Sequence, residues 1–587
     1  MGEKRMKRWI KYVKPYLTSF ILGPLGMIVE VIGEMFMPLL LAMIINEGEA
    51  GTLTVGKSLG YAGILIAIVL CMMAGGVAGA YFGSKASVNF AADLRSDVYS
   101  KIQMYSFANI DKYQAGSLVT RMTNDVTQIQ NFVNMLLRMA LRSPGMLIGG
   151  IIMAVALKPS LSLVLLVTMP LLIITILLLI RVAFPRFGIM QKKIDKLNST
   201  VRENVTNVRV VKSFVREDFE IDKFEGDNRD LKESGMRAVK LMIWMGPVMN
   251  IFMYVTVIAV IWFGHGIVLS EHSLAGGMQI GDLSAFITYT TQILSSLMMV
   301  TMLLMTSSRA LASGRRICEV LDEKLDISDN GAKYPERRVE SGEIEFRDVT
   351  FRYYKNSEEA VLDNISIKIE AGSTVGIIGS TGCGKTTLVS MIPRLYDTDS
   401  GEVLIDGVNV KDYSLVHLRD GIGMVLQKNL LFSGSIADNL RWGDMEATDE
   451  EMKLAARHSC ADKFVDSFSD GYDTMLDKGG MNLSGGQKQR LCIARALLKK
   501  PKILILDDST SAVDTATEAQ IREAFANELS GTTKIIIAQR ISSVKGAEKI
   551  IVMNDGKITG VGTHDELLKN NVEYGEIYYS QMDKKEG

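Results

Sequence analysis

The sequence predicts two domains in one chain: an all-α transmembrane domain with six spanning helices, followed by an α/β domain of the P-loop type. Hydrophobic residues make up 48% of the 587 residues, and their excess lies in the first half of the chain. A glycine-rich phosphate-binding pattern follows an apolar strand in the second half. The chain is longer than one hydrophobic core usually allows. We therefore expect a transmembrane domain at 1–320, a linker at 321–341 and the P-loop domain at 342–587.

Charge and cysteine content exclude two other classes of protein. The formal net charge is −1, so no overall positive field attracts nucleic acid, and we expect no nucleic-acid partner. The five cysteines show neither metal-ligand spacing nor the pattern of a small disulfide-rich domain. Free thiols are therefore expected at Cys71, Cys318, Cys383, Cys460 and Cys492.

Six apolar segments are each long enough to cross a bilayer, which takes about 20 residues. The first is too long for a cleaved signal peptide and has no cleavage site. We therefore expect a multi-pass membrane protein that is surrounded by lipid. The expected spans are 17–46, 59–85, 132–157, 160–183, 241–270 and 283–309.

Basic residues give the expected orientation. The leader "EKRMKRWIKYVKPY" interleaves cations with aromatic residues, as in a helix that lies on a membrane surface. The long connections 86–131 and 184–240 are rich in Lys and Arg, whereas the three short ones carry only Lys57 and Lys158. The positive-inside rule places both termini and both long connections in the cytoplasm of a plasma membrane.

The two long connections have apolar residues at helical spacing, so we expect helices that continue well beyond the membrane. Each helix pair would close on a short turn, around Phe107–Tyr113 and Val211–Glu217. These turns could press on a cytoplasmic domain; plain connecting coil is the alternative.

Four charges lie inside the spans, where an unpaired charge is costly. Glu30 and Glu34 are four residues apart, as are Arg138 and Arg142, and each pair is expected to share a helix face. They either line a cavity for charged substrate or pair with one another between helices.

The phosphate-binding pattern has the required strand–loop–helix setting. "STVGIIG" leads into "GSTGCGKTT" and then the helical "LVSMIPRLY". The backbone N–H groups would wrap a phosphate, Lys385 would reach the β and γ phosphates of ATP, and Thr386 would hold Mg²⁺. Cys383 is expected to be a reactive thiol because of its place in the loop. The loop residues are Gly379, Ser380, Thr381, Gly382, Cys383, Gly384, Lys385, Thr386 and Thr387.

The apolar strand "KILILD" ends in an acid, Asp507, which would hold the metal through water. Between this strand and the P-loop lies "NLSGGQKQR", Asn482 to Arg490. These motifs together resemble the ATP-binding cassette (ABC) ATPases. Six spans before one cassette resemble a half-size ABC exporter of the multidrug or lipid type, over nearly the whole chain.

The resemblance implies further roles. Tyr353 in "VTFRYY" is placed to stack on adenine, and Gln427 to sense Mg²⁺ and the γ-phosphate. "SAVD", Ser511 to Asp514, matches a loop that crosses to the opposite cassette, and "TRMTNDV", Thr120 to Val126, resembles the stretch after the first coupling turn. In "LDKGG", Lys478 replaces a usual glutamate.

In this family two cassettes enclose two ATP molecules, each held between one chain's P-loop and the other chain's signature. The helix that begins at the signature can point its N-terminus at the γ-phosphate across the interface. One cassette per chain therefore implies a dimer. The signature residues that act on the partner's nucleotide are Ser484, Gly485, Gly486 and Gln487.

Two residues depart from the family pattern. Asp508 stands where a glutamate polarises the attacking water, and its carboxylate is about 1.5 Å shorter in reach. Misplacement on that scale can cost about 100-fold in rate. Gln539 stands where a histidine contacts the γ-phosphate, and an amide cannot titrate. The chain resembles the degenerate-site subunit of heterodimeric bacterial multidrug exporters, whose partner has the complementary defect.

The function expected from this resemblance is ATP-driven export of hydrophobic or amphipathic, drug-like small molecules across a bacterial plasma membrane. The alternative is a homodimeric lipid or peptide exporter with slow ATP turnover; peptides rank last because no peptidase domain precedes the spans. A second alternative is a non-transporting member of the family that gates an ion path. The six spans exclude a soluble cassette protein that acts in translation or DNA repair.

Overall fold

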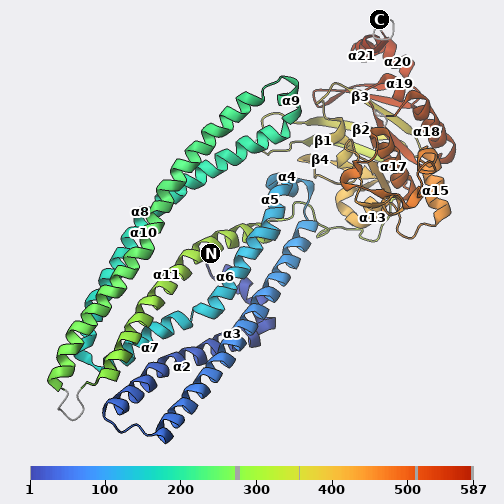
Figure 1. Ribbon diagram of the computed structural model, residues 1–587. Coiled ribbons are helices and arrows are strands. Elements are labelled where there is room, and N and C mark those ends of the chain that lie inside the picture. Colours follow the sequence, from blue (N-terminus) through green and yellow to red (C-terminus); the bar gives the residue numbers. More distant parts are fainter. Residues whose placement is uncertain (1, 272–277, 356, 509–512, 583–587) are drawn as a thin grey trace. The chain divides into compact units, whose positions relative to one another are not determined.

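The computed structural model describes residues 2–271, 278–355, 357–508 and 513–582. They form two compact units (Figure 1). Unit 1 comprises Met1–Lys101 and Leu118–Asp322, and unit 2 comprises Ile102–Ser117 and Glu323–Gly587. Unit 2 therefore includes a short segment from the first half of the chain.

The described residues of unit 1 are mainly helical, and six stretches are long and apolar enough to cross a membrane, which confirms the six predicted spans. The helices are α1 (Gly2–Val13), the 3-10 helix η1 (Lys14–Tyr16), α2 (Leu17–Glu49), α3 (Val55–Gln103), α5 (Ala115–Thr120, at the boundary of the two units), the π-helix η2 (Arg121–Asp125), α6 (Val126–Met139), α7 (Arg142–Leu157), α8 (Pro159–Thr206), α9 (Val208–Ser213), α10 (Glu217–Glu271) and α11 (Ile280–Asp322).

Helices α2 and α3 pack closely through glycine. Gly75, Gly79 and Gly83 follow one another at intervals of four and are all buried on one face of α3. A Cβ on Gly26 of α2 would lie 2.5 Å from the carbonyl oxygen of Gly75. Small residues at this spacing let two membrane helices approach backbone to backbone, where dispersion contacts stabilise the pair.

The predicted third span, 132–157, contains a local irregularity in its helix. Helix α6 ends at Met139 and α7 begins at Arg142, with a turn between them. Ala140 and Leu141 keep backbones in the right-handed helical region, and Ala115–Leu157 forms one candidate span, so the expectation that Arg138 and Arg142 share a helix face stays a prediction.

The charged residues in the spans differ in whether they form ion pairs. Arg142 forms ion pairs with two acids of α2, at 3.0 Å to Glu30 and 2.7 Å to Glu34. Arg138 is exposed and forms no ion pair within the described part of the chain. The pairing supports the structural interpretation of Glu30, Glu34 and Arg142, since a paired charge is far less costly at membrane depth.

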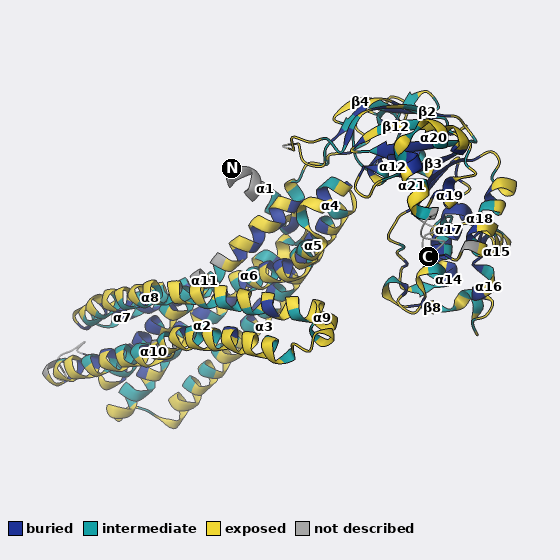
Figure 2. Cartoon of the chain, turned by 90° about the horizontal axis from the view of Figure 1, so that it is seen from above, coloured by how far each residue is buried: buried dark blue, intermediate teal, exposed yellow. Residues whose placement is uncertain are grey.

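Helices α8 and α10 form a long hairpin closed by the short helix α9, as the periodicity predicts. Long stretches of α8 and α10 are exposed (Figure 2). Large apolar residues are among them, including Leu166, Ile258 and Trp262. Apolar residues all around a long helix are typical of a membrane segment.

Unit 2 is built on a six-stranded sheet with strand order β12-β11-β3-β10-β9-β6, in which only β12 is antiparallel. A four-stranded antiparallel sheet has the order β2-β1-β4-β5, and β7 pairs with β8. The strands are β1 (Ile344–Phe351), β2 (Leu362–Ile369), β3 (Thr374–Gly379), β4 (Ser400–Ile405), β5 (Val408–Asn409), β6 (Ile422–Val425), β7 (Gly434–Ser435), β8 (Met475–Leu476), β9 (Ile503–Asp507), β10 (Thr533–Ile537), β11 (Lys549–Asn554) and β12 (Lys557–Gly562).

Both faces of the six-stranded sheet are buried. In β9, Ile503 and Ile505 belong to one hydrophobic core, and Leu504 and Leu506 belong to the other. This explains the unbroken apolar run in the sequence, since a parallel strand covered on both faces has no polar side. The helices of unit 2 are α4 (Phe107–Tyr113), α12 (Lys385–Met391), α13 (Leu415–Asp420), α14 (Ile436–Arg441), α15 (Asp449–His458), α16 (Asp462–Val465), α17 (Gly485–Leu498), α18 (Thr515–Glu528), α19 (Ile541–Val544), α20 (His564–Asn570) and α21 (Val572–Met582), with the 3-10 helices η3 (Val410–Asp412), η4 (Gly471–Asp473) and η5 (Lys478–Gly480).

The predicted turn around Phe107–Tyr113 is the short helix α4, and it belongs to unit 2. Ser106 and Asn109 cap its start reciprocally. Three contacts hold it within the unit: Asn109 donates to the carbonyl oxygen of Lys324 at 3.1 Å, Lys112 pairs with Glu323 at 2.8 Å, and Tyr396 donates to Asp111 at 3.1 Å. The turn is therefore anchored to unit 2.

Candidate functional site

The sheet of unit 2 gathers the predicted site residues at one edge. Strands β3, β10, β9 and β6 are parallel neighbours, so their carboxyl ends lie side by side. Gly379 ends β3, Gln539 lies two residues after β10, Asp507 ends β9 with Asp508 next, and Gln427 lies two residues after β6. Four separate motifs are thereby brought together by strand order alone.

The loop from Ser380 to Gly384 connects β3 to α12 and carries the phosphate-binding pattern. Gly382 and Gly384 have φ of +89° and +96°, a region that side chains with a Cβ rarely adopt. A Cβ on Gly384 would also lie 2.7 Å from the carbonyl oxygen of Val361. The glycines are thus required by the backbone itself, which turns the N–H groups of the loop toward one concave surface.

Lys385 begins α12, and its ammonium donates to the carbonyl oxygens of Gly379 at 2.9 Å and Ser380 at 2.7 Å. The next residue, Thr386, donates its hydroxyl proton to the Asp507 carboxylate at 2.9 Å. A hydroxyl and a carboxylate in contact beside a phosphate-binding loop are the hard oxygen donors that Mg²⁺ prefers, with the remaining ligands from phosphate and water. The residues present therefore fit a magnesium–nucleotide complex.

Asp507 is almost fully buried, and this burial raises its pKa above the ordinary value, while the hydrogen bond from Thr386 acts in the opposite direction. The neighbouring charge of Asp508 raises the pKa further. A cation at this position would offset both effects, because it favours the charged carboxylate.

Asp508 and Gln539, the two residues that depart from the expected pattern, contact each other. The Gln539 amide donates from Nε2 to Oδ2 of Asp508 at 2.7 Å. Burial raises the pKa of Asp508, and this hydrogen bond partly opposes the rise. The backbone of Asp508 has φ of +50°, and its N–H donates to the carbonyl oxygen of Ile537 at 3.0 Å, so the end of β10 holds its main chain and Gln539, two residues further on, holds its side chain.

Two further residues support this pair, and the sequence analysis did not identify them. Gln489 of α17 is fully buried and donates to the carbonyl oxygen of Asp508 at 3.3 Å. Gln581 of α21 donates to the carbonyl oxygen of Gln539 and accepts from the N–H of Ile541, both at 2.9 Å. Gln489 lies inside "LSGGQKQR" and was open to prediction, whereas no local signal marks Gln581.

The signature residues form the start of α17, a helix of 14 residues. Ser484 is the N-cap: its hydroxyl accepts from the N–H of Gln487 at 3.3 Å, and the Gln487 side chain accepts from the N–H of Ser484 at 2.8 Å. This reciprocal pair is a capping box. Ser484 and Gly485 are exposed and Gly486 is half-buried, so this helix start is open to a ligand or partner.

Tyr353 lies beside the phosphate-binding helix. Its hydroxyl is 2.9 Å from the hydroxyl of Thr387, and its ring is 45% exposed. The rings of Phe351 and Tyr396 meet it edge-on, with centroids 5.0 and 5.3 Å away. These contacts fix the ring next to the P-loop while leaving part of it accessible, as stacking on a planar base requires.

The expectation that Cys383 is a reactive thiol is wrong for the folded protein. Its side chain is only 3% exposed and packs in the hydrophobic core beneath β3. The sulfur lies under the loop, 3.7 Å from the ammonium of Lys385 and 2.9 Å from where a Cβ on Gly379 would be. Ser511 and Ala512 of "SAVD" lie outside the described residues, and Asp514 caps α18 by accepting from the N–H of Thr517 at 3.0 Å.

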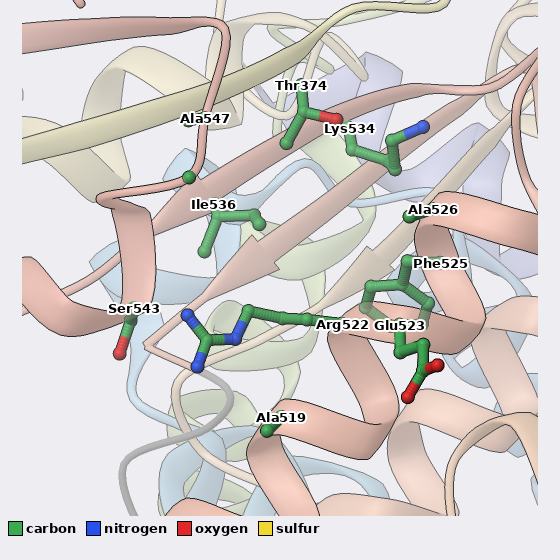
Figure 3. Close-up of a pocket in the computed structure, with 11 residues that line it drawn as sticks. Thr374, Ala519, Arg522, Glu523, Phe525, Ala526, Lys534, Ile536, Ser543 and Ala547 are labelled. Atoms are coloured by element: carbon green, nitrogen blue, oxygen red, sulfur yellow. The ribbon is translucent and has the colours of Figure 1, made fainter. Parts of the chain in front are cut away.

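A cavity of about 400 Å³ lies elsewhere in unit 2, between α18, β10 and α19 (Figure 3). Thr374 and Lys534, which line it, are at the amino ends of β3 and β10, opposite to the edge that carries the P-loop. The ammonium of Lys534 donates to the carbonyl oxygen of Leu529 at 2.9 Å. The cavity therefore lies apart from the predicted nucleotide-binding residues at the carboxyl edge of the sheet.

Comparison with known proteins gives matches over both halves of the chain. Residues 20–297 match the family described as "ABC transporter transmembrane region", and residues 362–511 match the family described as "ABC transporter". The chain is 37% identical to "Uncharacterized ABC transporter ATP-binding protein YfiB" of Bacillus subtilis (strain 168), over 99% of both chains. It is also 37% identical to "Uncharacterized ABC transporter ATP-binding protein Rv1273c" of Mycobacterium tuberculosis (strain ATCC 25618 / H37Rv), over 97% of both.

The fold is similar to a solved structure described as "Structure of a bacterial Atm1-family ABC exporter with ATP bound". The TM-score is 0.77, with 23% sequence identity over 97% of this chain and 98% of the other. This confirms the predicted fold class, six spanning helices followed by a nucleotide-binding domain.

Proposed function

The chain belongs to the ABC transporter family as a half-size exporter with its own ATPase domain, and from this premise we propose that it is the degenerate-site subunit of a heterodimer. The observation that carries the proposal is the contact between Asp508 and Gln539, beside a complete signature at Ser484–Gln487. We further propose the domain limits 1–320, 321–341 and 342–587.

The nucleotide site proposed for this chain holds MgATP on the P-loop. Lys385 exchanges its two carbonyl partners for phosphate oxygens, while Thr386 and Asp507 hold the metal and Gln427 approaches it from the end of β6. Tyr353 stacks on the base. The proposed contacts to nucleotide are those of Tyr353, Gly379, Ser380, Thr381, Gly382, Cys383 (through its backbone), Gly384, Lys385, Thr386, Thr387 and Gln427.

Hydrolysis at this site is proposed to be slow for two physical reasons. The Asp508 carboxylate is about 1.5 Å short of the position a glutamate would reach. In addition, the amide of Gln539 occupies one of its oxygens at 2.7 Å, and an amide can neither accept a proton nor become cationic. The pair can hold a water molecule and is poorly suited to activating one.

In the arrangement of this family, the signature of one chain contacts the nucleotide on the partner's P-loop and not the nucleotide on its own P-loop. We therefore propose a partner half-transporter with Glu after its Walker B aspartate, His at its switch position and an altered signature. A homodimer would combine two sites that both carry Asp508 and Gln539, and slow turnover would follow.

The proposed cargo is a hydrophobic or amphipathic small molecule. Support comes from the ion pairing of Glu30 and Glu34 with Arg142, which leaves few free charges among the spans for a strongly charged cargo. Both termini are proposed to be cytoplasmic in a bacterial plasma membrane, in line with the basic residues of the long connections.

The test is to purify the tagged, full-length chain from its own membranes under mild conditions and to identify what accompanies it. A second half-transporter in a one-to-one ratio with the complementary residues is the expected result. A homodimer as the only species recovered would contradict the proposal.

A further inference from the structure

A groove of about 420 Å³ lies within unit 1, where α1 and the start of α2 pack against α3, α6 and α11. Its walls are almost entirely apolar. Trp9 stacks on Phe90 at one side, with ring centroids 6.1 Å apart, and Leu136 and Leu311 line it while remaining 40% and 62% exposed. Ligand pockets in proteins commonly measure about 300–1,000 Å³. The groove is therefore large enough for one hydrocarbon chain and is open at its surface.

The groove lies where the sequence places the end of two membrane spans, next to the expected spans 17–46 and 283–309. Phe20, in its wall, is in the first turn of α2, directly after the basic, amphipathic α1. Its wall on α11 begins at Ala310, directly after the expected sixth span 283–309. Hydrocarbon and headgroup meet at this depth, and tryptophan is enriched there because its ring is apolar and its N–H is polar.

One cation at the groove has no partner among the residues that the structure describes. Arg315 is exposed and makes no hydrogen bond or ion pair within the described residues. Nearby cations differ: Arg8 pairs with Asp322, Lys11 with Asp97, and Arg316 with Asp125. The indole N–H of Trp9 is likewise without a hydrogen bond among the described residues. A spare positive charge and a spare donor thus border an apolar slot.

We propose that this groove binds an anionic phospholipid, with one acyl chain in the slot and the phosphate on Arg315. A zwitterionic lipid would gain the same apolar contact but little from the charge, so the site selects by headgroup. The long aliphatic stem of Arg315 lies along the slot while its guanidinium stays at the polar boundary, as cationic side chains do at membrane surfaces. The inference does not depend on whether the partner is a second copy or a different half-transporter.

The test uses the full-length transporter, with its natural partner, in nanodiscs that contain phosphatidylglycerol with a photoreactive group on one acyl chain. Labelled positions are mapped by mass spectrometry. We expect labels within 129–136 or 310–318, about five-fold more with phosphatidylglycerol than with phosphatidylcholine carrying the same group. Arg315→Gln should remove this headgroup preference, whereas Arg95→Gln, an exposed arginine of α3 with no ion pair among the described residues, should keep it.

A second variant tests the slot itself. Leu136→Trp with Leu311→Trp adds bulk at two exposed positions, so the helices keep their buried contacts while the groove fills. Labelling at these segments should fall to background in a protein that still elutes as the intact complex. Equal labelling by the two lipids in the unmodified protein would overturn the proposal, as would displacement of the label by a drug-like cation but not by unlabelled phosphatidylglycerol.

Discussion

The signature loop at Ser484–Gln487 and the pair Asp508–Gln539 belong to the same unit, yet their sequences are constrained in different ways. The capping box explains Ser484 and Gln487 without any nucleotide, because a helix start favours these residues for its own stability. It does not explain Gly485 and Gly486, which lie in the first turn of α17 and have ordinary helical backbones. Glycine there costs the helix up to about 1 kcal/mol relative to alanine.

The two glycines are therefore the informative part of the signature, because the capping box does not account for them and each carries a cost to the helix. Close approach of a phosphate to the helix backbone would supply the missing reason. At the other region the opposite holds. Asp508 and Gln539 satisfy each other at 2.7 Å, so local structure accounts for them and the chemistry of water activation does not.

The largest expected effect comes from substituting the signature. Gly485→Asp, and less severely Ser484→Ala, should lower the ATPase rate of the heterodimer by about 10²–10³, because an oriented donor to the transition state is lost. Asp508→Asn should change that rate little, since its own site contributes little. Steady-state rates at saturating MgATP measure both.

Loss of the helix cap is the main confounding factor, so a matched control is needed. Thr448→Ala removes an equivalent capping box from α15, together with its bond to the N–H of Glu451, and should leave the ATPase rate nearly unchanged. Equal losses from Asp508→Asn and Ser484→Ala would contradict the degenerate-site assignment and favour a homodimer.

An intermediate effect is expected from Lys385→Ala. It removes the cation that would bind the β and γ phosphates, so nucleotide should leave this chain's P-loop while the partner's hydrolysis continues at a reduced rate. Photolabelling with an azido-ATP, followed by separation of the two subunits, reports binding at each site. Lys453→Ala, an exposed lysine of α15 with no ion pair among the described residues, is the control; a P-loop that labels as strongly as the unmodified chain would show that Lys385 has no such role.

A smaller change, and a gain, is expected from Asp508→Glu with Gln539→His. The longer carboxylate recovers the missing reach of about 1.5 Å, and hydrolysis at this chain's own site should rise by less than the full factor of about 100. The rise is incomplete because this ATP still faces the partner's altered signature. Trapping of labelled ADP at this P-loop, before and after the double substitution, measures the change. If trapping does not increase, the position and charge of these two side chains do not limit the rate of hydrolysis at this site.

The smallest effect concerns the residue that joins the two regions. Gln489→Leu removes the donor to the Asp508 carbonyl oxygen from a buried position, at a cost of about 1–3 kcal/mol in stability. The thermal midpoint of the complex should fall by a few degrees while the ATPase rate per folded molecule changes less than with Gly485→Asp. If the rate instead falls as far as with Gly485→Asp, the two regions do not act separately.

The sequence allowed prediction of the P-loop, Asp507 and the signature because each follows or precedes a strongly apolar strand or helix, and parallel strand order then brings them together. The contact of Asp508 with Gln539 follows from the same strand order, since β9 and β10 are neighbours. The burial of Cys383 could not be predicted, because it depends on how its side chain packs in the core beneath β3. The contacts of Gln581 are tertiary and leave no periodic signal, whereas the break between α6 and α7 has a local signal in Pro144, which has no N–H to donate to the carbonyl oxygen of Ala140.

Because of helix α4, the ATPase unit is not encoded by one continuous segment of the chain. Phe107 packs on Tyr396, with ring centroids 6.0 Å apart, and Asp111 accepts from the Tyr396 hydroxyl. The ATPase unit thus completes its surface with a segment encoded more than 200 residues earlier. A gene fragment that begins at Glu323 would encode every nucleotide-binding motif and still lack this segment. Exchange of ATPase units between transporters would therefore have to preserve the match between Tyr396 and whatever helix replaces α4.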